Sequence, residues 1–347
     1  MKYVKRNTFI IKHIVAIGLI LLILFLLEKF LSGFWLTLLM LFGINIILAI
    51  SLNITNGWIG FFSVGHGGIM LAGAYAAAFF TLPVSFKEGI LGLHLPSFML
   101  HTQLPFLPAL LIGGIVGTAI GIVLVLPALR LRGFYFCAGT LGFNIIMETI
   151  TENIPDITNG AMGLSQFPSY TNIWWVWGIA ILLIYVTWVV KKSYIGRAFI
   201  TIGKNPDLAE HMGINLLKYK VYAFGFSAFF TALGGILWVH LILNLFPKAF
   251  DLVLVFEVVA MIVIGGMGSI TGSIIGAAII TFFADILAPI EEGFSLFGFN
   301  VPRMLGLMTV LIGVLLVVIL IKKPDGIMGE KEISQGFFRK FLRTKQS

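Results

Sequence analysis

Long apolar stretches alternate with short polar segments along almost the whole chain. Each stretch approaches the roughly 20 residues that an α-helix needs to cross the hydrocarbon core of a bilayer. Ten of them can be placed, at residues 11–31, 34–52, 57–80, 106–128, 133–150, 173–190, 221–243, 252–266, 270–289 and 303–321. The pattern therefore predicts an all-α polytopic membrane protein with about ten transmembrane helices.

The third stretch and the 252–289 pair fit continuous helices least well. Residues 53–68 hold two asparagines, Asn53 and Asn56, and five glycines, and glycine weakens a helix by about 1 kcal/mol per residue. Irregular backbone at membrane depth is tolerated only where protein or a water-filled cavity covers it. We expect part of 53–68 to be broken or re-entrant, and to line a solute pathway.

The longest polar interruption inside the chain is residues 191–220. It contains six basic residues and a short helix with clear end signals. Asn205 can cap the helix N-terminus, Pro206 suits its first position and Asp207 suits the positive end of its dipole. Gly213 can end the helix in a left-handed conformation.

Charge placement sets the expected topology. Hydrophobic residues make up 59% of the chain and charged residues 11%, against about 25% charged in soluble domains. Nineteen of the 23 Lys and Arg fall within 1–12, 130–132, 191–220 and 322–347, and the positive-inside rule places these segments in the cytoplasm. We expect a single transmembrane domain over 1–347 with both termini cytoplasmic. The net charge of +8 then reflects membrane topology, and we expect no nucleic acid as a partner.

Enzyme signatures are absent from the sequence. Gly203-Lys204 lacks both the upstream glycine and the following Ser or Thr of a phosphate loop, and there is no H-E-x-x-H or nucleophile elbow. The six histidines lack metal-ligand spacing. We expect no catalytic residue, metal or cofactor here, so transport against a gradient would draw its energy from a partner or from ions.

Polar residues inside the spans are the candidates for contact with a solute, because such residues are costly in a membrane. Glu257 is either a pathway residue or a hydrogen-bonding partner between helices. His66, within a glycine-rich run, is either a solute contact or a satisfied buried histidine. Glycines spaced by four, at 113, 117 and 121 and at 268, 272 and 276, indicate close helix packing.

Several motifs, in order, resemble the permease subunits of branched-chain amino acid ABC importers, specifically the longer of the two paired permeases. The resemblance covers about 45–327. It rests on segments spread along that range, namely Gly57–His66 with Gly73–Tyr75, Leu129–Gly133 with Tyr135 and Thr140–Phe143, Thr158–Leu164, Ile195–Ala198, Ala209–Asn215, Glu257 with Gly265–Gly272, and Lys323–Ile327.

The resemblance implies a multi-pass subunit of a bacterial or archaeal cytoplasmic membrane. It would pair with a related permease and two ATP-binding subunits, which bind the ATP, and receive solute from an extracytoplasmic binding protein. It also implies that residues 209–213 form the helix that couples to an ATPase. The expected coupling residues are Asn205, Pro206, Asp207, Ala209, Glu210, Gly213 and Ile214. The pathway candidates are Ser63, Gly65, His66, Thr140, Asn144 and Glu257.

Three alternatives stay open from the sequence. Relatives in the same family carry urea, short amides or other amino acids, and Ile145 stands where the family often has an acidic residue. An ion-coupled secondary transporter working alone would also suit a chain without a nucleotide site. A structural membrane subunit without a pore is the third.

Overall fold

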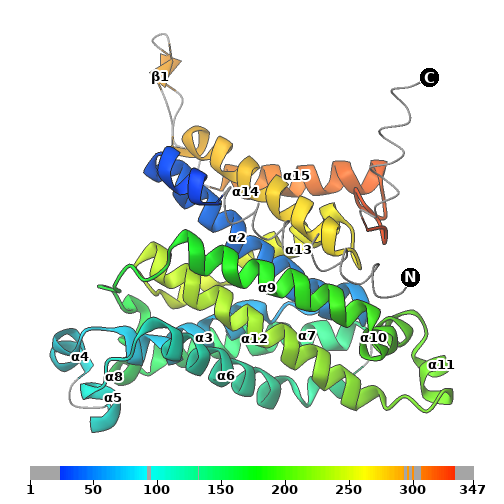
Figure 1. Ribbon diagram of the computed structural model, residues 1–347, viewed down its shortest axis with the longest axis horizontal. Coiled ribbons are helices and arrows are strands. Elements are labelled where there is room, and N and C mark those ends of the chain that lie inside the picture. Colours follow the sequence, from blue (N-terminus) through cyan, green and yellow to red (C-terminus); the bar gives the residue numbers. More distant parts are fainter. Residues whose placement is uncertain are drawn as a thin grey trace, which may run out of the picture.

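The computed structural model describes residues 24–91, 95–131, 133–292, 295–296, 299–300 and 306–332, and it is built almost entirely of helices (Figure 1). The expected N-terminal segment 1–12, most of the first span, Arg132 and the tail beyond residue 332 lie outside the described residues. Residues 24–30, at the end of the first expected span, are helical.

The other nine expected spans each correspond to a described helix. These helices are α2 (Gly33–Asn53), α3 (His66–Thr81), α6 (Phe106–Val125), α7 (Phe134–Asn153), α9 (Ile173–Lys192), α12 (Leu216–Ile242), α13 (Leu252–Gly265), α14 (Ile270–Glu292) and α15 (Leu307–Lys322). Five helices of the described part, starting at residues 33, 106, 173, 216 and 270, are long and apolar enough to cross a membrane. The expected all-α membrane fold is confirmed.

Short elements lie at the two ends of the bundle. Figure 1 shows α4 (Val84–Leu91), α5 (Ser97–His101) and α8 (Pro155–Thr158) at one end, and α10 (Tyr194–Lys204) and α11 (Pro206–His211) at the other. Further short pieces are the π-helical turn Ile54–Trp58, the 3₁₀ turns Ala128–Arg130, Gly160–Met162 and Pro247–Phe250, and the antiparallel strands β1 (Ser295–Leu296) and β2 (Phe299–Asn300).

Helix α2 is the centre of the bundle. It contacts α9, α12, α13 and α14, and every residue from Ile46 to Asn53 is buried. A helix that is buried on all sides has no need of an amphipathic pattern, which explains the unbroken apolar run in this part of the sequence. The helix therefore joins the α13–α14–α15 group to the α3–α6–α12 group (Figure 1).

Glycines allow α6 to pack closely against α3 and α12. A Cβ atom at Gly117 would lie 2.9 Å from Ala232 Cβ and 3.0 Å from Gly73 Cα, so no larger residue fits without a shift. The expected packing role of the first glycine set is confirmed. In the second set, Gly268 precedes α14 and has a φ of +88°, so it belongs to a turn and not to a helix face.

The chain is broken between α2 and α3. A π-helical turn at Ile54–Trp58 follows α2, and the backbone then leaves helical geometry until α3 begins at His66. The expected break within 53–68 is confirmed, but the expected start of the third span at residue 57 is wrong. Gly57 has no room for a Cβ, which would lie 2.4 Å from Gly268 N, and Gly60 has a φ of +74°.

Helix α13 is shorter than a full span. Its 14 residues measure about 21 Å at 1.5 Å per residue, less than the roughly 30 Å of a hydrocarbon core. It ends at Gly265, followed by Gly266 with a φ of +120°. The expected 252–266 span is therefore a short helix that turns sharply into α14.

Candidate functional site

The predicted end signals of α11 are confirmed. The side chain of Asn205 accepts a hydrogen bond from Leu208 N at 2.9 Å, and Pro206 and Asp207 occupy the first turn. Gly213 has a φ of +77°, and Ile214 N donates to Ala209 O at 3.0 Å. These contacts satisfy backbone groups at both helix ends, where the helix itself offers no partner.

Helix α11 presents apolar side chains to solvent. Ala209 is fully buried and Ile214 is buried, so these residues anchor the segment to the bundle. Leu208 and Met212, in contrast, are 51% and 67% exposed, and Glu210 is exposed beside them. An exposed apolar surface on an otherwise polar segment is typical of a protein–protein contact.

Helix α10, which precedes α11, was not predicted from the sequence. Ser193 caps its N-terminus by accepting from Gly196 N at 3.3 Å, and Ala198, Phe199 and Ile202 bury one face. The serine cap and this helical spacing were the available signals. The following span also starts earlier than expected, because Asn215 caps α12 at residue 216.

The end of α10 packs directly on the broken segment. A Cβ atom at Gly203 would lie only 2.2 Å from Trp58 O, and one at Gly60 would lie 3.2 Å from Gly203 O. The two backbones therefore touch without intervening side chains. Helix α11 begins only a few residues after Gly203, so this contact is the nearest connection between α11 and the break between α2 and α3 along the α10–α11 segment.

Hydrogen bonds close the broken segment on itself and hold it against α7. Asn56 Oδ1 accepts from Ser63 N at 2.9 Å, and Thr140 Oγ1 accepts from Val64 N at 3.1 Å. Helix α3 starts after a glycine, which offers no capping side chain. Asn144 of α7 supplies that cap instead, because its Oδ1 accepts from Gly68 N.

His66 joins a second buried network. Its Nε2 lies 3.1 Å from Ser227 Oγ, and Ser227 Oγ donates to Ser51 O at 2.6 Å. Its Nδ1 is buried and has no hydrogen-bond partner within the described chain. His66 is thus a buried histidine that is satisfied on one side of its ring.

Five of the six pathway candidates lie together at the break and on α7, and the sixth lies on α13. The five lie at the break and on the facing side of α7, and all are buried, namely Ser63, Gly65, His66, Thr140 and Asn144. In this conformation they are closed from any surface. Glu257 lies on α13, is partly exposed, and makes no hydrogen bond or ion pair within the described residues.

Helix α7 differs from the other long helices. It has 20 residues but is not among the five apolar spans, since it carries asparagines, glutamates and threonines along its second half. Gly142, where an added Cβ would meet nothing within 4 Å, lies on a face that also exposes Ile145 and Thr149. The exposed side also carries Ile146 and Ile150, so the open face of α7 is a mixed surface that no other part of the described chain covers.

The opposite end of the bundle is held by buried polar contacts. Lys87 Nζ donates to the backbone carbonyls of Phe79, Met99 and Thr102 at 3.1, 2.8 and 2.7 Å. Burial lowers the pKa of the Lys87 ammonium, and the three carbonyl acceptors favour its charged form. The contacts tie α4, α5 and the end of α3 into one unit.

The segment Thr158–Leu164, part of the family resemblance, forms a turn at this same end. Asn159, Gly160 and Gly163 all have φ near +60°, and Asn159 Nδ2 donates to Gly163 O at 2.6 Å. Leu164 then pairs with Leu245 through two backbone hydrogen bonds. The turn is therefore a defined shape on the surface, with Met162 exposed.

Comparison with known proteins identifies the family to which this chain belongs. The family model described as "Branched-chain amino acid transport system / permease component" matches residues 34–320. The chain belongs to this permease family. The match spans the break, α7, the α10–α11 segment and the α13–α14 turn, so the family covers every part of the site described above.

Curated relatives include permeases for different solutes. The chain is 26% identical to the high-affinity branched-chain amino acid transport system permease protein LivM of Salmonella typhimurium, covering 82% of this chain and 68% of the relative. It is 23% identical to the probable LivM of Methanocaldococcus jannaschii, covering 84% and 92%. The ribose import permease protein RbsC of Haemophilus influenzae is 30% identical over 32% of this chain and 36% of its own length. No solved structure matches the sequence significantly.

Membership in the permease family settles the coarse assignment. The protein is a multi-pass permease of the inner membrane, and the relatives that it matches are transport permease proteins. The family does not by itself assign the solute, because relatives named for amino acids and for ribose both match.

Proposed function

We propose that this chain is the solute-translocating subunit of an ATP-driven importer for branched-chain or related amino acids. It would act with a related permease, two ATP-binding subunits and an extracytoplasmic binding protein. The observation that carries the proposal is α11, a capped helix with Leu208 and Met212 exposed at the predicted cytoplasmic end. Family membership over residues 34–320 supports it.

Helix α11 would be the contact with an ATP-binding subunit. Its exposed apolar side chains suit a groove on a partner, and its helix caps keep it folded outside the bundle. ATP binding would displace α11, and α10 would carry the displacement to Gly60 and Trp58. The ATPase would thereby bias the equilibrium between two conformations of the permease.

The solute path would follow the open face of α7, between this chain and the related permease. The pathway candidates at the break lie behind that face and are buried here, so they would meet solute only in another conformation. A broken helix supplies free backbone groups and a helix N-terminus, which suit the carboxylate and ammonium of an amino acid. Glu257 would contribute from α13.

The choice of amino acid as solute follows the relatives matched over most of the chain. The alignments with the two LivM relatives described above cover more than four fifths of this chain, whereas the alignment with the ribose permease covers 32%. A binding assay with the cognate solute-binding protein would separate branched-chain amino acids from urea, short amides and sugars.

The docking role of α11 is tested by co-purification. The tagged chain, isolated from its native membrane in mild detergent, is expected to retain an ATP-binding subunit. Leu208→Glu should reduce the retained subunit at least about tenfold, because charge at the centre of an apolar contact removes more than 1.4 kcal/mol. Phe98→Glu, an exposed apolar position on α5 at the opposite end, is the matched control and should change nothing.

Two results would contradict the proposal. One is a wild-type chain that retains no ATP-binding subunit. The other is equal retention by the Leu208→Glu variant and the control, which would show that the partner docks elsewhere.

A further inference from the structure

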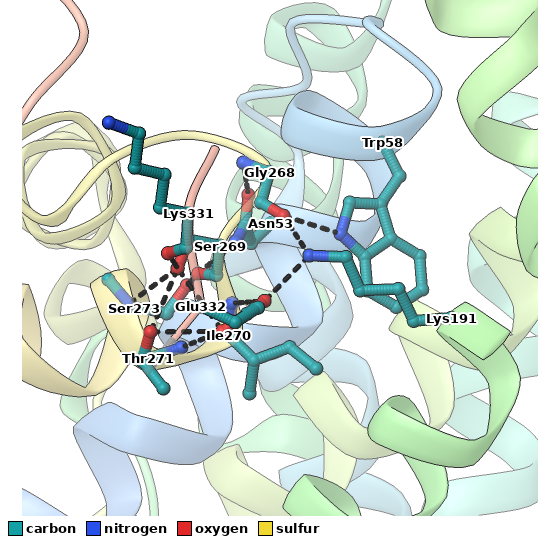
Figure 2. Close-up of polar contacts among 11 residues, drawn as sticks. Asn53, Trp58, Lys191, Gly268, Ser269, Ile270, Thr271, Ser273, Lys331 and Glu332 are labelled. Carbon is teal, nitrogen blue, oxygen red and sulfur yellow. Dashed lines mark hydrogen bonds and ion pairs between the residues drawn. The ribbon is translucent and has the colours of Figure 1, made fainter. Parts of the chain in front are cut away.

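A polar cluster joins the C-terminal segment to three other parts of the chain. Figure 2 shows its members, which we call the tail node. They come from α2, the end of α9, the α13–α14 turn and the segment after α15, and they are Asn53, Lys191, Gly268, Ser269 and Glu332. No motif in the sequence relates Lys191 to Glu332.

Glu332 occupies the N-terminus of α14. Its carboxylate accepts hydrogen bonds from Ile270 N at 2.8 Å and from Thr271 N at 3.0 Å. Thr271 Oγ1 donates to the same carboxylate at 2.9 Å. Glu332 thus supplies the cap and the negative charge that a helix N-terminus favours.

Lys191, at the end of α9, binds both the Glu332 carboxylate and the α13–α14 turn. Its Nζ lies 2.6 Å from Glu332 Oε1, and it also donates to Gly268 O at 2.6 Å. Burial acts to raise the pKa of Glu332, but the hydrogen bonds from Lys191, Ile270 and Thr271 outweigh it, so the pKa is lowered below its usual range. The contact is therefore complete at neutral pH and is lost only as the pH falls through that lowered value.

The node is bonded to the chain on the α2 side of the break. Trp58 Nε1 donates to Gly268 O at 3.2 Å, and Asn53 accepts from Gly268 N at 2.8 Å and donates to Ser269 O at 2.9 Å. The turn between α13 and α14 is thus fixed to α2 and to the π-helical turn that follows it. Backbone bonds from Ile327 and Met328 to Ile264 and Gly265 hold the tail on the same turn.

We propose that Glu332 is a positioning residue for energy coupling, which makes the α13–α14 turn move together with the joint between α9 and α10. Lys191 lies in the last turn of α9, immediately before α10 begins. Displacement of α11 and α10 therefore reaches α14 through one charged contact, in addition to the Gly203–Trp58 contact. This inference rests on the proposed function, since it requires an ATPase partner that displaces α11.

A neighbouring ion pair offers a matched control. Lys204 and Glu330 lie 3.0 Å apart, with side chains 62% and 72% exposed. The side chains of Lys191 and Glu332 are only 19% and 30% exposed. An exposed pair is screened by water and contributes little, so removal of Glu330 charge should leave coupling intact.

The test compares Glu332→Gln and Glu330→Gln in the assembled transporter. Two quantities are measured, namely amide hydrogen exchange at Ile270 and Thr271, and solute uptake per ATP hydrolysed. Glu332→Gln should accelerate exchange at these amides and lower uptake per ATP about fivefold or more, the range of ordinary coupling energies. ATP hydrolysis should persist, because the nucleotide sites would lie in the partner, and Glu330→Gln should match wild type in both measurements.

Unchanged uptake per ATP in Glu332→Gln, together with faster exchange, would overturn the coupling role and leave the proposed function standing. Wild-type uptake that needs no ATP would overturn both. If Glu332→Gln does not assemble, Lys191→Gln takes its place, because it removes the ion pair and keeps the bonds from Ile270 and Thr271. Normal uptake per ATP in that variant would equally contradict the proposal.

Discussion

Gly203→Ala is expected to reduce solute uptake at least about tenfold, because overpacking of a close contact costs about 1–3 kcal/mol. The new Cβ would lie 2.2 Å from Trp58 O, and a backbone oxygen cannot rotate away as a flexible side chain can. The end of α10 and the π-helical turn must therefore separate by about 1 Å to restore ordinary contact. ATP hydrolysis by the partner should continue, so the variant should be uncoupled.

The matched control for this prediction is Gly178→Ala. Gly178 lies in α9, the helix before α10, and an added Cβ there meets nothing within 4 Å. Uptake and ATP hydrolysis are measured with both variants in proteoliposomes. Equal uptake by the two variants would show that the Gly203–Trp58 contact does not carry the displacement of α11.

Gly213→Val is expected to reduce uptake by about tenfold, since a left-handed conformation costs an L-residue about 1–2 kcal/mol, and a β-branched one more. Gly213 has a φ of +77°, and no atom lies within 4 Å of the position of an added Cβ. The cost is therefore conformational rather than steric. Relief of the strain would unwind the end of α11 and displace Leu208 and Met212.

Gly213→Asn tests whether uptake depends on the left-handed backbone conformation at this position or on the glycine residue itself. Asparagine tolerates the left-handed region, so this variant should retain most of the wild-type uptake and ATPase association. Both variants are compared by uptake and by co-purification of the ATP-binding subunit. If valine and asparagine behave alike, the backbone conformation at Gly213 is not what positions α11.

Local signals predicted those parts of the fold that depend on neighbouring residues. The apolar runs indicated nine of the described helices, and Asn205, Pro206 and Gly213 correctly bounded α11. The glycines of 53–68 correctly indicated a break. Each of these features depends on propensity or capping within a few residues, which a single sequence records directly.

Features that depend on distant contacts could not be predicted. Lys191 and Glu332 are 141 residues apart, and Asn53 and Gly268 are 215 apart, so no spacing in the sequence relates them. The cap of α3 comes from Asn144 of another helix, which explains why the third span starts later than its apolar run suggests. Helix α10 was missed because its polar face resembles a loop when hydropathy alone is read.

The arrangement of the pathway candidates also depends on contacts between residues far apart in the sequence. Ser63, Thr140 and Asn144 were singled out as polar positions within spans, and the structure brings them together at the break. Their present bonds are made to backbone groups of the chain itself. Which of these side chains meets solute depends on a second conformation, and the six pathway residues stay predictions.

The most direct test of the account is uptake by the assembled transporter in proteoliposomes, with its solute-binding protein outside and ATP inside. We predict that solute accumulates only when ATP is present, and that a proton or sodium gradient imposed without ATP supports none. Accumulation by this chain alone on an imposed ion gradient, with no ATP-binding subunit present, would contradict the account.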